Sequence, residues 1–337
     1  MGGMKAPVHI SLRIILVVAA AVVIFPACGR AADVPLKKVS CALLWKPQAQ
    51  FAGYIVAVEK GFYRQRGLDV TLVPGGANDP SLEALKNKKT DFCIAWLVSA
   101  VQRRAAGVAL VNVGQVVQRS ALMLISRRSS GILKPQDMQG RKVSLWEGDL
   151  RIQPEAYFRR TGVTAEIVPQ SYTVNLFLRG GVDAVSAMWY NEYDTIINSG
   201  LDPEELVTFF FSDLGMNFPE DGIYCLEETL DKDPAGAAAF VAASFDGWQY
   251  AFDHPDEAVD IVLARMREAH LPANRVHQRW MLSKMKDLIM PDDPAPAGTL
   301  VQNDFDRVAE ELLRGGLIEA IPLYRDFYRP PEGHVQE

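Results

Sequence analysis

The stretch that most constrains the fold is residues 39–67, because it alternates between strand-like and helix-like patterns. Residues 39–44 form a short apolar run that is typical of a buried strand, and Pro47 prevents the strand from continuing. Between residues 51 and 58 apolar side chains recur every three or four positions, which predicts a helix. A second apolar run at residues 68–73 completes a strand–helix–strand unit. The sequence therefore predicts an α/β fold, in which ligands bind beyond the carboxyl ends of the parallel strands.

Three segments carry a resemblance to a known family. They are WKPQAQFAGYIVAVEKGFYRQRGLDVTLVPGG at 45–76, TDFCIAW at 90–96 and DAVSAMWYNEY at 183–193. These segments resemble the solute-binding proteins related to thiamine-pyrimidine binding and synthesis, and the likeness extends over residues 38–260. The resemblance implies a type II periplasmic-binding-protein fold, in which two doubly wound α/β lobes are joined by two crossover strands.

The resemblance also implies a function. Proteins of this family bind flat nitrogen heterocycles, such as pyrimidine thiamine precursors or riboflavin, and deliver them to ABC importers. We therefore expect a ligand in the cleft between the lobes, hinge closure around it, and the permease and ATPase subunits of an importer as partners. A binding protein for sulfonates or other small anions is the alternative within the same class. Such a protein would need arginines or helix N-termini in the cleft.

An enzyme related to the pyrimidine synthases of the family is the alternative from another class. Those synthases use a histidine of the N-terminal motif and a cysteine-rich segment that binds iron. Here Phe51 stands at the position of that histidine, and the sequence has no cysteine cluster. We therefore expect no catalytic residues and no cofactor. Gln48 and Gln50 stand where the thiamine-pyrimidine binders have asparagines, so the resemblance does not fix the ligand.

The domain organisation follows from where the strand and helix patterns recur. We expect residues 37–126 and 222–330 to form the first lobe and residues 127–221 the second. The polar segment 127–139, with its serines, glycine and proline, is the predicted hinge. Residues 331–337 are predicted to be a disordered tail.

The first 32 residues have the pattern of a secretory signal. Lys5 and Arg13 are followed by an apolar core at residues 14–25, which is shorter than the roughly 20 residues that span a bilayer. Cleavage before Cys28, with lipid attached to that cysteine, and cleavage after residue 31 or 32 both fit the sequence. Either one places the protein in the periplasm or on the outer face of the cytoplasmic membrane, with contact to the membrane only through a lipid on Cys28.

Charge and cysteine content exclude two other kinds of site. The net charge of −6 argues against a nucleic-acid-binding surface. Cys41 and Cys93 lie inside predicted strands and are expected to be core residues. No cysteine or histidine spacing indicates a metal site, and the histidines lie outside the predicted cleft loops.

Four tryptophans follow the ends of predicted parallel strands. They are Trp45, Trp96, Trp146 and Trp189. Tryptophan is unusual at a buried strand end because its N–H needs a partner, so the set predicts an aromatic-lined cleft that stacks against a flat ring. Capping of the core beneath each loop is the simpler reading for any single one. Trp248 and Trp280 lie in the helical C-terminal part and are expected to be core residues.

Glu192 is the leading polar candidate. Its carboxylate follows a predicted strand and could accept hydrogen bonds from the ring N–H and amino groups of an aminopyrimidine; in the family that the chain resembles, an acidic residue of this segment contacts the pyrimidine. Stabilisation of a helix N-terminus is the alternative role. The remaining candidates are uncharged residues of the predicted cleft loops, namely Gln48, Gln50, Tyr54, Gly75, Gly76, Gln115, Gln170, Tyr190 and Asn191.

Overall fold

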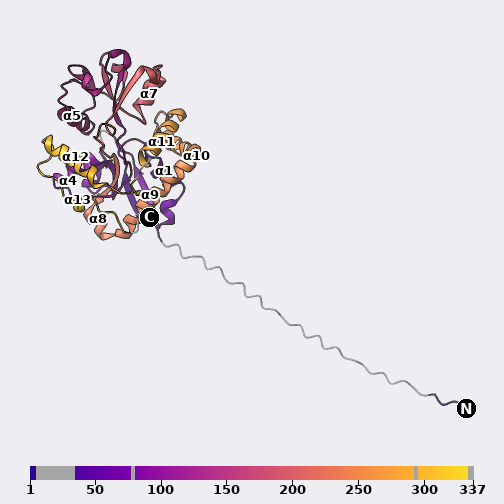
Figure 1. Ribbon diagram of the computed structural model, residues 1–337. Helices are drawn as coiled ribbons and strands as arrows, with labels where there is room; N and C mark the ends of the chain where they lie inside the picture. The colour runs from indigo at the N-terminus through magenta and orange to yellow at the C-terminus, as the bar shows by residue number, and fades with distance from the viewer. Residues whose placement is uncertain (5–34, 77–79, 292–294, 333–337) are drawn as a thin grey trace. The chain divides into compact units, whose positions relative to one another are not determined.

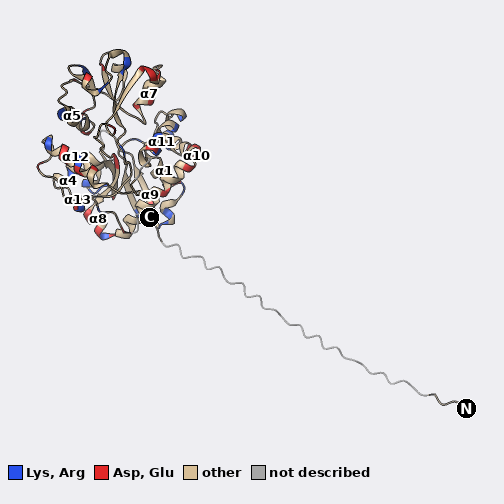
Figure 2. Cartoon of the chain, viewed as in Figure 1, with Lys and Arg blue, Asp and Glu red and all other residues tan. Residues whose placement is uncertain are grey.

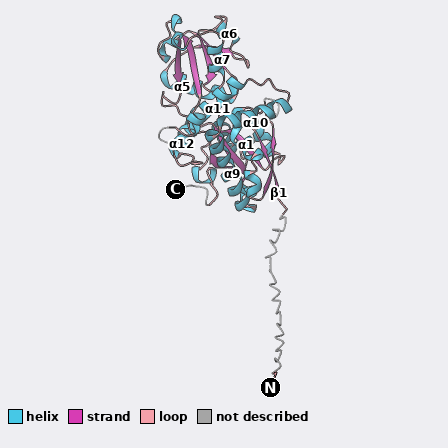
Figure 3. Ribbon diagram, turned by 90° about the vertical axis from the view of Figure 1, so that its right-hand side faces the viewer, coloured by secondary structure: helices cyan, strands magenta, loops and turns pink. Residues whose placement is uncertain are grey.

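The computed structural model describes residues 1–4, 35–76, 80–291 and 295–332. From Leu36 onward the chain forms one compact unit of two lobes, each built around a five-stranded mixed sheet (Figures 1 and 3). Residues 5–32 of the predicted signal segment, which include Cys28, and residues 333–337 of the predicted tail lie outside the described residues. None of the described helices is long and apolar enough to cross a membrane.

The first lobe contains the sheet ordered β2-β1-β3-β10-β4. Its strands are β1 (Lys37–Ala42), β2 (Leu68–Val73), β3 (Phe92–Trp96), β4 (Leu110–Gln115) and β10 (Asp221–Leu226). The predicted strand–helix–strand unit is present, with β1 parallel to β2 and α1 (Ala52–Glu59) between them in the chain. β10 runs antiparallel to both β3 and β4. The amino-terminal end of β10 therefore lies beside the carboxyl-terminal end of β3.

The second lobe contains the sheet ordered β7-β6-β8-β5-β9. Its strands are β5 (Leu122–Arg127), β6 (Lys142–Leu145), β7 (Glu166–Pro169), β8 (Ala184–Met188) and β9 (Leu206–Phe210). β5 is antiparallel to β8, and Leu122 pairs with Met188. As in the first lobe, the start of an antiparallel strand thus lies beside the end of a parallel one.

The position of β5 corrects the predicted lobe boundary and hinge. β5 was expected in the first lobe, but it is a central strand of the second sheet. The chain crosses between the lobes at residues 116–121 and 211–220, which separate β4 from β5 and β9 from β10. The polar segment 127–139 instead lies within the second lobe. Polarity marked this segment as a surface loop, but it did not mark a crossing point.

Helices cover both sheets, and most of the C-terminal ones belong to the first lobe (Figures 1 and 3). The helices of the first lobe are α2 (Phe62–Gln65), α3 (Ser81–Lys86), α4 (Leu97–Ala105), α8 (Glu227–Lys232), α9 (Pro234–Asp253), α10 (Pro255–Glu268), α11 (Arg275–Ile289), α12 (Gln302–Arg314) and α13 (Tyr324–Phe327), in addition to α1. The second lobe has α5 (Asp149–Thr161), α6 (Asn175–Leu178) and α7 (Glu192–Asn198). Short 3-10 turns include η1 (Ala49–Phe51), η2 (Arg128–Ser130), η3 (Pro135–Met138) and η4 (Pro203–Glu205).

Helix packing beneath the site depends on two glycines. A Cβ atom on Gly247 of α9 would lie 2.0 Å from the carbonyl oxygen of Gly53 in α1, so only a glycine permits this close crossing. The crossing holds α1, and with it the loop that precedes α1, against the first sheet. Cys41 and Cys93 are buried core residues, as predicted, and so is Trp248.

Charged side chains are distributed over the outer helices, where acidic and basic residues are interspersed (Figure 2). Many of them form exposed ion pairs, such as Lys88 with Glu228 and Arg314 with Glu310. Exposed pairs of this kind contribute little to stability. The charges that matter for the site are instead the few that are buried between the lobes.

Candidate functional site between the lobes

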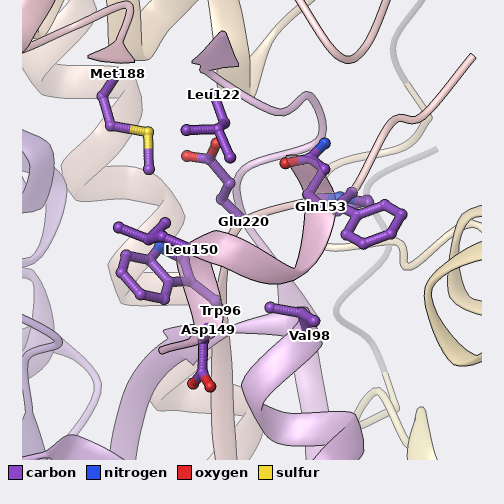
Figure 4. A pocket seen from close by; sticks show the side chains of 10 residues that line it. Trp96, Val98, Leu122, Asp149, Leu150, Gln153, Met188 and Glu220 are labelled. Atoms are coloured by element: carbon purple, nitrogen blue, oxygen red, sulfur yellow. The ribbon is translucent and has the colours of Figure 1, made fainter. Parts of the chain in front are cut away.

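A small cavity lies at the junction of the two lobes (Figure 4). Its lining comes from both sheets, from α4 and α5, and from the second crossover: Trp96, Val98, Leu122, Asp149, Leu150, Gln153, Met188, Phe218, Pro219 and Glu220. The cavity volume is about 20 Å³, which is room for a single water molecule. The structure is therefore a closed arrangement of the lobes, and a ring-sized ligand can enter only if the lobes separate or the lining side chains move.

Two neighbouring acids, Glu220 and Asp221, form the polar centre of the junction. Glu220 lines the cavity, and its Oε1 accepts hydrogen bonds from the Ala121 N–H at 2.5 Å and from the Ser120 hydroxyl at 3.3 Å. Asp221 accepts a hydrogen bond from Gln50 at 2.9 Å through Oδ2. Asp221 Oδ1 is buried and has no hydrogen-bond partner among the described residues.

Burial shifts the pKa of both carboxyls upward. Burial and the neighbouring Asp221 raise the pKa of Glu220 to about 8, although hydrogen bonds from Ala121 and Ser120 act in the opposite direction. Burial raises the pKa of Asp221 to about 7 despite the hydrogen bond from Gln50. Two acids with pKa values this far above the ordinary range, beside a cavity, mark the junction as a candidate functional site.

Trp96 brings a hydrogen-bond donor to the same cavity. Its indole ring lies beneath Leu150, and Met188 and Glu220 lie above both residues in the view of Figure 4. The Nε1–H group is buried and has no partner among the described residues. A buried donor that is left unsatisfied costs about 1–3 kcal/mol, so a ligand that accepts this hydrogen bond gains affinity.

The other predicted tryptophans do not line the cavity. Trp45 of the first lobe contacts Tyr172 of the second, with 5.8 Å between ring centroids. Trp146 donates from Nε1 to the carbonyl oxygen of Ser171 at 3.2 Å. These two rings therefore lie around the same loop of the second lobe, at a rim of the junction.

Trp189 contacts α11 of the first lobe. Lys284 places its Nζ 4.4 Å from the centroid of the Trp189 ring, and Trp280 donates from Nε1 to the Trp189 carbonyl oxygen at 3.1 Å. Trp280 was expected in the core, but it is only partly buried because it bridges the lobes. Helix periodicity identified its apolar character and could not distinguish a core contact from a contact between lobes.

Glu192 has protein partners for both carboxyl oxygens. Oε2 accepts from the Met188 N–H at 3.0 Å, and Oε1 accepts from the Asn191 side-chain amide at 2.7 Å. Desolvation raises the pKa of Glu192 above its ordinary value. As the first residue of α7, it holds the turn between β8 and α7 together. Tyr190 is buried near this turn. Burial raises the pKa of Tyr190 well above its ordinary value, and the nearby Glu220, Asp221 and Glu192 add to the shift.

His277 of α11 extends this network across the junction. Its Nδ1 lies 2.6 Å from the carboxylate of Asp194, and its Nε2 lies 2.9 Å from Oδ1 of Asn191. The histidines were expected outside the predicted cleft loops. His277 lies on α11, but its side chain contacts the turn between β8 and α7. The residue lies 86 positions from Asn191 in the chain, so only the folded arrangement of α11 brings the two together.

The predicted glutamines divide into two groups. Gln48 donates to Gln50 at 2.7 Å, and Gln50 in turn donates to Asp221, so this pair leads to the acidic centre. Gln115 is buried and donates to the backbone carbonyls of residues 117 and 220, which fixes the two crossovers. Gln170 exchanges hydrogen bonds with the backbone of residue 186 inside the second lobe.

The remaining candidates support the loops of the first lobe. Tyr54 is buried in an edge contact with Trp248, where burial and the nearby Asp221 raise its pKa well above the ordinary value. Gly75 passes close to the backbone of β1, since a Cβ there would lie 2.0 Å from the Leu43 carbonyl oxygen. Gly76 has a φ of 154°. The two glycines permit the tight passage of the loop that follows β2.

The sequence reading missed Glu220, Asp221, His277 and the cavity residues of α5. Site residues were expected at the carboxyl ends of parallel strands, whereas Glu220 precedes and Asp221 begins an antiparallel strand. One signal was present in the sequence, because two adjacent acids stand immediately before the apolar run at residues 222–226. No groups of three or more acidic, histidine or cysteine side chains suited to a metal ion occur within the described part of the chain.

Fold and junction together define a two-lobed α/β protein with a buried polar site between its lobes. The chain belongs to the family described as NMT1/THI5 like, whose model matches residues 48–258. The predicted family and fold class are thereby confirmed.

Individual relatives match most of the chain. The formylaminopyrimidine-binding protein of Halalkalibacterium halodurans is 24% identical over 71% of this chain and 74% of its own length. The riboflavin-binding protein RibY of Chloroflexus aurantiacus is 22% identical over 70% and 68%. A yeast 4-amino-5-hydroxymethyl-2-methylpyrimidine phosphate synthase, THI11 of Saccharomyces cerevisiae, is 20% identical over only 40% of the chain and 39% of its own length.

A solved structure shares the fold. The periplasmic aliphatic sulphonate binding protein SsuA from Escherichia coli superposes with a TM-score of 0.69 at 16% identity, over 89% of this chain and 95% of that one. Relatives and structural neighbours thus include binding proteins for both heterocycles and sulfonates. The chemistry of the junction has to distinguish these ligand classes.

Proposed function

We propose that the protein is the extracytoplasmic solute-binding component of an ABC importer, and that its ligand is a flat nitrogen heterocycle held between the lobes. The family, and the names of the relatives that match most of the chain, support a binding function. The ligand would contact both lobes and so stabilise their closed arrangement. The permease and ATPase subunits of the importer would then recognise the closed form.

The composition of the cavity lining favours a heterocycle over a sulfonate as the ligand. Among the described residues that line it, the charged side chains are acidic, namely Asp149 and Glu220, and none is basic. A buried sulfonate without a cation partner would be strongly disfavoured. A neutral or basic ring, by contrast, gains a contact with the indole of Trp96 and hydrogen bonds from the polar groups.

No enzymatic role is proposed. Phe51 is fully buried in the first-lobe core, so the position at which the resemblance implies the synthase histidine holds an apolar core side chain. The three free cysteines of the described residues, Cys41, Cys93 and Cys225, are buried on strands of the first sheet, and burial raises the pKa of all three thiols well above the ordinary value. Thiols in this state are poor nucleophiles and poor metal ligands.

A thermal-shift and native mass-spectrometry panel tests the ligand class on the full chain. Aminopyrimidines, thiamine, riboflavin, nucleobases and alkanesulfonates are added separately, and a ligand that binds only the folded state raises the midpoint of unfolding. We expect a shift and a bound mass with at least one heterocycle and none with the sulfonates. A shift with sulfonates alone would overturn the heterocycle assignment while leaving the binding function in place.

A further inference from the structure

We propose that Glu220 recognises a basic ring nitrogen of the ligand by sharing a proton with it, while the Trp96 indole N–H donates to a second acceptor on the same ligand. The inference rests on the proposed function and narrows it, from flat nitrogen heterocycles in general to rings with a basic nitrogen, such as aminopyrimidines. It also assigns the selection to Glu220 instead of Glu192.

The carboxyl group of Glu220 is held in one orientation. The Ala121 N–H and the Ser120 hydroxyl both contact Oε1, and Ser120 also lies 3.1 Å from Oε1 of Gln153. Oε1 is therefore occupied by the first crossover, and the ligand nitrogen is placed at Oε2. Figure 4 shows the carboxyl group beside Leu122, above Leu150 and the ring of Trp96.

Protonation makes Oε2 of Glu220 selective for a basic ring nitrogen. Because burial raises the pKa of Glu220 to about 8, the carboxyl group carries a proton near neutral pH. A basic ring nitrogen can accept that proton fully or partly, so the pair is either O–H···N or O⁻···H–N⁺, and no proton is gained or lost. The charged form is the stronger hydrogen bond in a site that excludes water. A ring without a basic nitrogen cannot form it.

The surroundings favour a ligand that carries positive charge. Asp221 lies next to Glu220, and its Oδ1 has no hydrogen-bond partner among the described residues. No basic side chain belongs to the described lining of the cavity. A ring that takes up the proton of Glu220 is therefore stabilised by the adjacent acid, and Trp96 offers its N–H to an acceptor such as a second ring nitrogen or a substituent oxygen.

Glu192 is the matched comparison. It is also a carboxyl group with a pKa raised by desolvation, but both of its oxygens already have partners from its own turn. Glu192 is also absent from the cavity lining. The two acids thus predict different outcomes when each is replaced by glutamine.

The experiment measures affinity against ring basicity. Calorimetric titrations use 2-methylpyrimidines that carry a 4-amino, 4-methyl or 4-oxo group, of which the 4-amino ring is the most basic and the 4-oxo ring the least. In the wild-type protein the 4-amino compound should bind at least about tenfold more tightly than the 4-oxo compound, which corresponds to one charge-assisted hydrogen bond. E220Q should reduce the ratio to less than about threefold, and E192Q should keep the wild-type ratio.

A pH profile of the wild-type protein tests the same inference without a variant. Above about pH 8 the free protein has lost the Glu220 proton, so binding of the 4-amino ring must take up a proton and should weaken about tenfold per pH unit. The 4-oxo ring should show a much smaller dependence. Circular dichroism and melting curves of both variants show whether each is folded.

The outcomes separate the inference from the proposed function. If heterocycles bind but the ratio is unchanged in E220Q, or falls in E192Q instead, Glu220 does not select the ring and the binding function stands. A flat wild-type pH profile above pH 8 would have the same meaning. If none of the three pyrimidines binds while sulfonates do, both the inference and the heterocycle assignment are wrong.

Discussion

Trp96 combines two possible contributions to binding in one side chain, the flat face of its ring and its N–H. The ring lines the cavity, and the buried N–H has no hydrogen-bond partner among the described residues. Phenylalanine keeps an aromatic face and removes only the donor. The substitution therefore separates stacking from hydrogen bonding.

We expect W96F to weaken heterocycle binding about five- to tenfold, which is the typical worth of one neutral hydrogen bond. The free energy of unfolding without ligand should stay the same or rise, because the substitution removes an unsatisfied buried donor. Titration calorimetry and urea unfolding measure the two quantities. W146F is the matched control, since Trp146 donates to the Ser171 carbonyl oxygen outside the cavity and should leave affinity unchanged. An unchanged affinity for W96F would show that the N–H makes no contact with the ligand.

At the scale of elements, α11 is the part of the first lobe that reaches across to α7 and the end of β8. The contacts are His277 with Asp194 and Asn191, Trp280 with the Trp189 carbonyl oxygen, and Lys284 over the Trp189 ring. Both ring nitrogens of His277 face oxygen acceptors, because the Asn191 amide nitrogen already donates to Glu192. His277 therefore contacts the second lobe through both ring nitrogens, and these contacts form only when the lobes are together.

The H277A substitution should therefore favour separation of the lobes. We expect a larger radius of gyration in small-angle scattering without ligand, and a ligand affinity reduced about tenfold, because closing the lobes no longer gains these hydrogen bonds. V276A is the control on the same helix, since Val276 is 70% exposed. Saturating ligand should restore the compact radius of H277A. Equal radii and affinities for H277A and wild type would show that α11 does not hold the closed arrangement.

The sequence was sufficient to predict the elements whose pattern is local. The first strand–helix–strand unit is present, and the strand predicted at residues 68–73 matches β2 at both ends. The crossovers and the acidic centre were not predicted, because they depend on which strands pair. β5 joins the second sheet through hydrogen bonds to β8 and β9, and β10 runs antiparallel to β3, so Asp221 pairs with Trp96. No local sequence pattern specifies that register. The contacts of His277 with Asp194 and Asn191 depend in the same way on where α11 packs.

At the scale of the whole molecule, the buried acids link stability to pH. The pKa of Glu220 rises from the ordinary 4.5 to about 8, and that of Asp221 from 3.8 to about 7. At pH values between the unfolded-state and folded-state pKa of each acid, the folded state holds a proton that the unfolded state has released. The free energy of unfolding therefore decreases as pH rises. The stabilisation is complete below about pH 4, where both states are protonated, and it is lost progressively as pH approaches 8.

We expect the free energy of unfolding to be about 6 kcal/mol lower at pH 8 than at pH 5, given roughly 1.4 kcal/mol per pKa unit for each group. Urea unfolding without ligand at the two pH values measures the difference. The double variant E220Q/D221N replaces both acids by neutral amides of similar shape, so its stability should change much less between the same pH values. If stability instead rises from pH 5 to pH 8 in the wild type and in the double variant alike, the two acids are ionised in the folded protein. The shared-proton basis for ligand selection would then be wrong as well.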